Sequence, residues 1–200
     1  MKILFSAILL SSSLFSSQLA LDAFKQKDYK KAYTLYLQEA NNGDLKAKSA
    51  LSYLYFNALG VEKNSSKALK YLTQAADGNY TTAQYDLGMI YLLGEDDIKT
   101  DKQKAFKWLS RAADLNHTQA KYNLALMYYQ GEGTQIDVKK SAELLESAAK
   151  DGDKQSQKIV GKIYMQLLKF KKAKPWLELN AKNGDEDAKH LLEVVDKEIN

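Results

Sequence analysis

The chain has 200 residues, a formal net charge of +4 and no cysteine. Without cysteine it cannot have a disulfide framework, a thiolate zinc site or a catalytic cysteine. Its cations are lysines except for Arg111, and arginine is the side chain that most often reads DNA bases, so we expect no nucleic-acid partner. Ten glycines and one proline, in a chain rich in Ala, Leu, Lys and Tyr, predict an all-α protein.

The N-terminus resembles a secretory signal peptide. Lys2 supplies a basic start, residues 3–10 form an apolar run broken only by Ser6, and small polar residues follow. The apolar run is shorter than the roughly 18–20 residues that span a bilayer, which favours cleavage over a permanent anchor. Cleavage after Ala20 supplies the small residue that the peptidase needs, although Gln18 departs from the usual pattern. We therefore expect residues 1–20 to be removed and the product to be exported, periplasmic or secreted, without a transmembrane anchor.

The rest of the chain repeats itself. An aliphatic residue, a small residue, two mostly apolar residues and a tyrosine recur from Leu51, Leu87, Leu124 and Val160, at intervals of 36, 37 and 36 residues (87 − 51, 124 − 87 and 160 − 124). A second block ends in the alanine pairs at 75–76, 112–113 and 148–149. In each block the apolar or small positions fall at i, i+3, i+4, i+7 and i+8, which is one face of an α-helix. Each repeat is therefore predicted to be a helical hairpin.

Turn and cap residues separate these predicted helices. We expect the residues that close the second helices to adopt the left-handed conformation, since they are glycine or asparagine: Gly43, Asn79, Asn116, Gly152 and Gly184. Polar residues expected in the loops and caps before second helices are Asn64, Asp101 and Asp137. A small residue inside each first helix predicts close approach of a neighbouring helix: Ser52, Gly88, Ala125 and Gly161.

These motifs resemble the Sel-1-like repeat, a relative of the tetratricopeptide repeat. Residues 83–119 fit its pattern best, with Ala83, Leu87, Gly88, Tyr91, Gly94, Lys104, Ala105, Trp108, Ala112 and Ala113 in register. The resemblance implies a right-handed α-solenoid of helical hairpins whose first helices line a concave face. The predicted organisation is a signal peptide at 1–20, a partial N-terminal repeat at 21–46, Sel-1-like repeats at 47–82, 83–119 and 120–155, a shortened repeat at 156–187 and a C-terminal capping helix at 188–200.

Two features depart from the family pattern. Pro175 follows Ala173 by two residues, so we expect the second helix of the last hairpin to start late or to bend. The exported, cysteine-rich members of the family bridge the two helices of each repeat with a cysteine pair. Because this chain has no cysteine, properties that depend on those bridges are not carried over.

Catalytic motifs are weakly represented. Ser147 and Lys150 have the Ser-x-x-Lys spacing of penicillin-interacting serine enzymes, but the partner motifs Ser-Asp-Asn and Lys-Thr-Gly do not occur. Neither His117 nor His190 has a second ligand or carboxylate at the spacing that a metal or a proton relay needs. We therefore expect no catalytic residue, no metal and no cofactor. An envelope hydrolase acting on β-lactams or cell-wall precursors, as suggested for some exported relatives, is the alternative.

A protein-binding or peptide-binding role has more support. In the predicted register, aromatic and flexible apolar side chains point toward the concave face, and such side chains suit adaptable grooves. The candidate partner-binding residues are Tyr53, Phe56, Tyr85, Met89, Leu92, Tyr122, Leu126 and Tyr129. The competing interpretation is that they only pack neighbouring repeats together. We expect a monomeric scaffold that binds a protein or peptide. An adaptor that modulates an envelope enzyme or is secreted into a host is a further alternative, because it needs the same exposed groove and the sequence does not separate the two.

Overall fold

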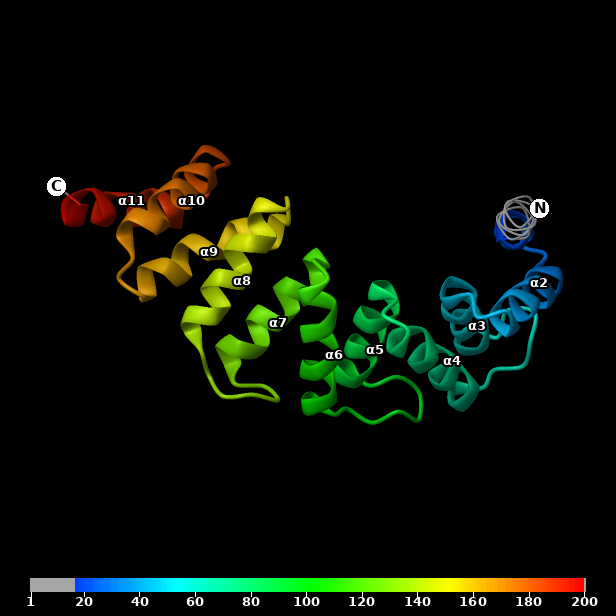
Figure 1. Ribbon diagram of the computed structural model, residues 1–200. Helices are drawn as coiled ribbons and strands as arrows, with labels where there is room; N and C mark the ends of the chain where they lie inside the picture. The colour runs from blue at the N-terminus through cyan, green and yellow to red at the C-terminus, as the bar shows by residue number, and fades with distance from the viewer. Residues whose placement is uncertain (1–16, 200) are drawn as a thin grey trace, which may run out of the picture. The chain divides into compact units, whose positions relative to one another are not determined.

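A computed structural model describes residues 17–199 of the protein. Over this range the chain forms α-helices and no strand, and its one isolated β-bridge joins Glu95 and Ile98. The chain divides into two compact units, Met1–Lys99 and Thr100–Asn200 (Figure 1). The predicted all-α fold of successive helical hairpins is confirmed.

The first unit begins with a helical segment at residues 17–25. It continues with α2 (Tyr29–Asn41), α3 (Leu45–Phe56), α4 (Ser65–Asp77) and α5 (Thr81–Leu93). Within this unit α2 contacts α3, α3 contacts α4 and α4 contacts α5. The buried core between them consists mainly of small and aliphatic side chains, among them Ala32, Ala47, Leu51 and Leu54.

The second unit contains α6 (Lys102–Asp114), α7 (Thr118–Gln130), α8 (Val138–Lys150), α9 (Lys154–Gln166), α10 (Phe170–Lys182) and α11 (Glu186–Ile199). Here too each helix contacts the next. Its core is centred on Leu145, Val160, Tyr164 and Leu177. The terminal helix α11 packs against α10 and contributes Ala188 and Val195 to this core, as the amphipathic pattern of its sequence requires.

Polar side chains determine where most of the helices begin. The side chain of the N-cap residue accepts a hydrogen bond from a backbone N–H in the first turn of eight helices within residues 17–199, and such a bond stabilises a helix by about 1 kcal/mol. These N-caps are Asp28, Asp44, Asn64, Asp101, His117, Asp137, Asp153 and Asp185. The caps expected at Asn64, Asp101 and Asp137 are therefore confirmed.

The helices end as the sequence predicts. All five residues expected in the left-handed conformation have positive φ angles: Gly43 (93°), Asn79 (65°), Asn116 (63°), Gly152 (94°) and Gly184 (90°). Asparagine tolerates this conformation better than other side chains that carry a Cβ, which explains why it alternates here with glycine.

Small residues inside the first helices allow close packing. Gly161 on α9 is buried, and a Cβ added there would lie 3.1 Å from Cδ2 of Leu177 on α10. Ser52 and Ala125 are buried at the corresponding positions of α3 and α7. The close approach that the sequence predicts is confirmed at Gly161, a position where glycine weakens the helix itself by roughly 1 kcal/mol.

Of the two outcomes expected at Pro175, a late start or a bend, the late start does not occur. Helix α10 begins at Phe170, five residues before the proline (175 − 170 = 5), and runs through it to Lys182. The side chains of Ala173 and Leu177 are buried and hold both flanks of the proline against the core. Pro175 and Lys171 are exposed, so the Lys171 carbonyl that loses its helical donor can bond to water instead.

The predicted signal peptide lies mostly outside the described residues, which begin at residue 17. Residues 17–25 are helical, and Ala20 and Ala23 are buried in the core of the first unit. Within residues 17–199, no helix is both long enough and apolar enough to cross a bilayer.

Candidate binding groove

A groove with a cavity volume of about 900 Å³ lies in the first unit. Its walls come mainly from α3 and α5, with the N-terminal helical segment 17–25 closing one side. The large apolar and aromatic side chains that line it are Leu21, Phe24, Tyr36, Tyr53, Phe56, Leu72, Tyr80, Tyr85, Met89 and Ile90. This volume is at the upper end of the range of about 300–1,000 Å³ that is usual for ligand sites.

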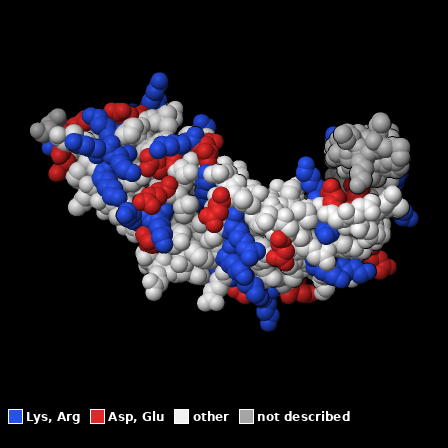
Figure 2. Space-filling model, viewed as in Figure 1, with Lys and Arg blue, Asp and Glu red and all other residues white. Residues whose placement is uncertain are grey.

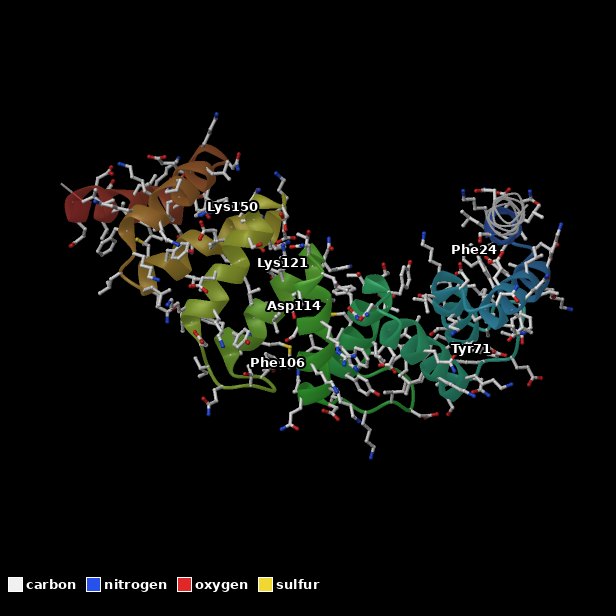
Figure 3. The ribbon with its side chains drawn as sticks, in the orientation of Figure 1. Phe24, Tyr71, Phe106, Asp114, Lys121 and Lys150 are labelled. Carbon is white, nitrogen blue, oxygen red and sulfur yellow. The ribbon has the colours of Figure 1, made fainter. Side chains whose placement is uncertain are left out.

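Aromatic contacts connect the N-terminal helical segment to α3 in the wall of the groove. The rings of Phe24 and Tyr53 meet edge to face, with centroids 5.9 Å apart, and Phe24 makes a second such contact with Tyr29 at 5.5 Å. Phe24 projects from the N-terminal helical segment (Figure 3). Tyr53 nevertheless remains 53% exposed, which is unusual for an aromatic side chain in a cluster. It is therefore accessible to a partner without unfolding.

Three ionic side chains line the groove: Lys46 on α3, Asp86 on α5 and Glu95 in the loop after α5. Asp86 is half-buried among the apolar residues, and this burial raises the pKa of its carboxyl group to about 6. Within residues 17–199, no hydrogen bond or ion pair to the Asp86 side chain is formed. The groove thus contains a carboxylate that has lost part of its hydration and gained no partner.

The structure gathers four of the eight predicted binding residues in this groove, namely Tyr53, Phe56, Tyr85 and Met89. Leu92 lies on α5 but does not line the cavity. Tyr122, Leu126 and Tyr129 lie on α7 in the second unit. Of these, Tyr122 packs against the second unit's core, as the packing interpretation anticipated, while Tyr129 is 38% exposed.

Sequence reasoning missed Phe24 and Asp86. Phe24 lies in the partial N-terminal repeat at 21–46, outside the four copies of the aliphatic-small-tyrosine pattern that set the register at Leu51, Leu87, Leu124 and Val160. Asp86 lies three residues before Met89 on the same helix, and residues at this spacing share a helix face, which is a signal that could have identified it. The corresponding positions in the other repeats are Ala50, Asn123 and Ile159, so only the repeat at 83–119 has a carboxylate there.

Charged side chains are concentrated elsewhere on the molecule. Figure 2 shows a largely uncharged area on the visible face of the first unit, whereas lysine and acidic side chains crowd the second unit. Two lysines of the second unit are paired with carboxylates of α11: Lys162 bonds to Asp187 at 2.8 Å and Lys174 to Asp196 at 2.8 Å. These pairs reduce the attraction of this region for an acidic partner.

Lys150 belongs to a cluster of polar side chains around the carboxylate of Glu146. The Lys150 ammonium lies 2.7 Å from Oε1 of Glu146, and the Tyr164 hydroxyl donates a short hydrogen bond to Oε2. Partial burial alone would raise the pKa of Glu146, but the bonds from Lys150 and Tyr164 lower it to about 2. The ammonium of Lys172 completes the cluster, 5.2 Å from the centre of the Tyr164 ring.

This cluster bears on the candidate nucleophile Ser147. Lys150 is the base that the Ser-x-x-Lys spacing requires, yet its ammonium is bonded to Glu146. Within residues 17–199, the side-chain hydrogen bond of this ammonium is to Glu146 and not to the Ser147 hydroxyl. The structure therefore gives the Ser147–Lys150 pair no geometric support as a catalytic pair.

The two histidines have different environments. His117 is the N-cap of α7, where its Nδ1 accepts a hydrogen bond from the Ala120 N–H at 3.3 Å, and partial burial lowers its pKa. His190 is exposed on α11. Over residues 17–199, no three His, Asp or Glu side chains are grouped closely enough to hold a metal ion.

Comparisons with known proteins agree with this architecture. The Sel1 repeat family pattern matches residues 22–44, 45–80, 81–117 and 118–153. The crystal structure of a Sel1 repeat protein from Oxalobacter formigenes is 29% identical, with a TM-score of 0.75, and the match covers 84% of this chain and 71% of that one. No curated protein matches the chain.

Two further solved structures are similar at lower sequence identity and lower TM-score. Cysteine-rich protein B of Helicobacter pylori is 25% identical, with a TM-score of 0.51, over 64% of this chain and 92% of that one. A protective antigen of uropathogenic Escherichia coli is 21% identical, with a TM-score of 0.48, and this chain spans about half of its length (49%). The repeat pattern covers most of the present chain, and its hairpins fold as those of solved Sel1 repeat proteins do. The chain therefore belongs to the Sel1 repeat family.

Proposed function

We propose that this protein is an exported, non-catalytic scaffold that binds a protein or peptide in the groove of its first unit. The observation that carries this proposal is the cavity of about 900 Å³, lined by aromatic and flexible apolar side chains from two successive first helices. Sel1 repeats commonly mediate protein interactions. A rigid helical scaffold that presents exposed aromatic side chains suits such a role, since these side chains provide much of the binding energy at interfaces.

The proposed export rests on the sequence of residues 1–20. Among the residues that the structure describes, cleavage after Ala20 would remove the buried side chain of Ala20 from the core of the first unit and would retain Leu21 and Phe24, which line the groove. Fractionation of the producing cells, with the N-terminal sequence of the product determined, tests this directly. A product that begins near residue 21 outside the cytoplasm supports export, and an intact chain inside the cytoplasm contradicts it.

The binding role is tested by affinity capture from cell-envelope and culture-medium fractions, followed by mass spectrometry. We expect a partner that is retained by the wild type and lost on Tyr53→Ala, because this side chain is exposed inside the groove. Tyr129→Ala is the matched control, since it removes an exposed tyrosine in the second unit. Equal retention by all three proteins would place binding outside the groove.

The non-catalytic assignment has its own test. We expect no turnover of a chromogenic β-lactam by the purified protein, because the lysine nearest Ser147 in the sequence motif is held by Glu146. Turnover that disappears in Ser147→Ala and remains in a Ser156→Ala control would contradict this assignment. Ser156 is a suitable control because its side chain is buried in α9.

A further inference from the structure

Asp86 lies in the groove without an internal role. Its helix α5 also supplies Tyr85, Met89 and Ile90 to the cavity, and α3 supplies Tyr53 and Phe56. Fold stability does not require a carboxylate here, because the corresponding positions in other repeats are occupied by Ala50, Asn123 and Ile159. The acidic side chain is thus a particular feature of the repeat that forms the groove.

The environment of Asp86 makes the carboxylate costly in the free protein. Partial burial removes water from the charged group, and within residues 17–199 no donor or cation replaces it. A group that weakens the fold and performs no structural task is characteristic of binding sites. A cation brought by a partner would remove this penalty, because a charged pair with a hydrogen bond compensates for lost hydration.

The charge balance of the groove favours a basic ligand. Of the three ionic side chains that line it, Asp86 and Glu95 are acidic and Lys46 is basic. The shift in the pKa of Asp86 arises from burial and not from Lys46, which indicates that this lysine does not neutralise the carboxylate. Tyrosine rings at 53, 80 and 85 line the same cavity, and tyrosine faces also attract cations.

We propose that Asp86 determines the specificity of the groove by anchoring one lysine or arginine side chain of a peptide segment whose neighbouring residues are apolar. The basic group pairs with the carboxylate, and the apolar neighbours contact Tyr53, Phe56 and Met89. This inference rests on the proposed function, because it specifies the partner of the same groove.

The test uses the full chain and arrays of short synthetic peptides that share apolar flanks and differ in one central residue, which is Lys, Arg, Met or Glu. We expect the wild type to retain the Lys and Arg peptides about tenfold better than the Met and Glu peptides, with the difference decreasing at high salt. Asp86→Asn should lose this preference while still binding the apolar flanks. Asp86→Lys should reverse it and favour the Glu peptide.

Control variants separate charge from folding and from the groove itself. Glu62→Gln removes an exposed carboxylate that does not line the cavity, and it should bind as the wild type does. Circular dichroism checks that each variant retains its helices. If Tyr53→Ala weakens binding but Asp86→Asn leaves the Lys and Arg preference unchanged, the inference about Asp86 is wrong and the proposed binding role of the groove is retained. If the wild type retains no peptide, or if the Tyr53→Ala variant retains the peptides as well as the wild type does, both the inference about Asp86 and the proposed binding role of the groove are wrong.

Discussion

The ammonium of Lys121 lies 2.7 Å from Oδ2 of Asp151. This ion pair joins α7, which carries Lys121, to the C-terminal end of α8, where Asp151 is the C-cap. Lys121 is only 6% exposed, so this ion pair is the main compensation for burying its charge. Glutamine occupies the corresponding position in two other repeats. There Gln84 donates to the Ala76 carbonyl at 3.1 Å and Gln157 to the Ala149 carbonyl at 2.9 Å.

This comparison predicts unequal effects of two substitutions. Asp151→Ala leaves the buried ammonium unpaired and should lower the free energy of unfolding by about 1–3 kcal/mol. Lys121→Gln should cost less than about 1 kcal/mol, because a glutamine there can bond to a carbonyl of the preceding helix as in the other repeats. Urea denaturation followed by circular dichroism measures both. A larger loss for Lys121→Gln than for Asp151→Ala would refute this account.

Asp86→Asn should stabilise the protein at neutral pH. Burial raises the folded-state pKa of Asp86 from 3.8 to about 6, so the folded state holds this proton more tightly than the unfolded state does. Its contribution to stability is therefore fully present below about pH 4 and is lost as the pH rises through about 6. At pH 7 we expect a gain of about 1–2 kcal/mol for Asp86→Asn, allowing for partial exposure. Thermal melts at pH 7.5 and pH 4 should show that this gain disappears in acid.

Glu146 should have the opposite pH dependence. Hydrogen bonds from Lys150 and Tyr164 lower its folded-state pKa from 4.5 to about 2, so its contribution is present above about pH 4.5 and is lost as the pH falls toward 2. We expect Glu146→Gln to lower the free energy of unfolding by about 1–2 kcal/mol at pH 7, with a smaller loss at pH 2.5. Glu143→Gln, an exposed neighbour on α8, is the control. A deficit that does not change with pH would contradict the assigned role of the carboxylate.

Pro175→Ala should stabilise helix α10. The substitution restores an N–H that can donate to the Lys171 carbonyl and introduces a better helix former. The unfolded chain also gains freedom, which offsets part of this effect, so we expect a net gain of about 1–2 kcal/mol. Differential scanning calorimetry measures the change in melting temperature. An unchanged or lower melting temperature would mean that the proline is already matched to its position.

The sequence alone determined the repeated architecture, because the signals that specify it are local. Helix periodicity lies within each block, and the caps at Asn64, Asp101 and Asp137 bond to backbone groups three residues away. The turns at Gly43 and Asn79 likewise depend on the conformational preference of one residue. Such signals can be read without knowledge of distant contacts.

Tertiary structure decided the site, because the groove depends on which side chains from separate helices meet. The sequence suggested Tyr53 and Met89, but only packing brings them together with Phe24 and leaves Asp86 partly buried without a partner. Ala173 and Leu177 pack into the core on both sides of Pro175, and α10 continues through the proline, where the sequence predicted a late start or a bend. Long-range contacts set burial and pairing, and burial and pairing determine whether a charged or aromatic side chain stabilises the fold or is available to a ligand.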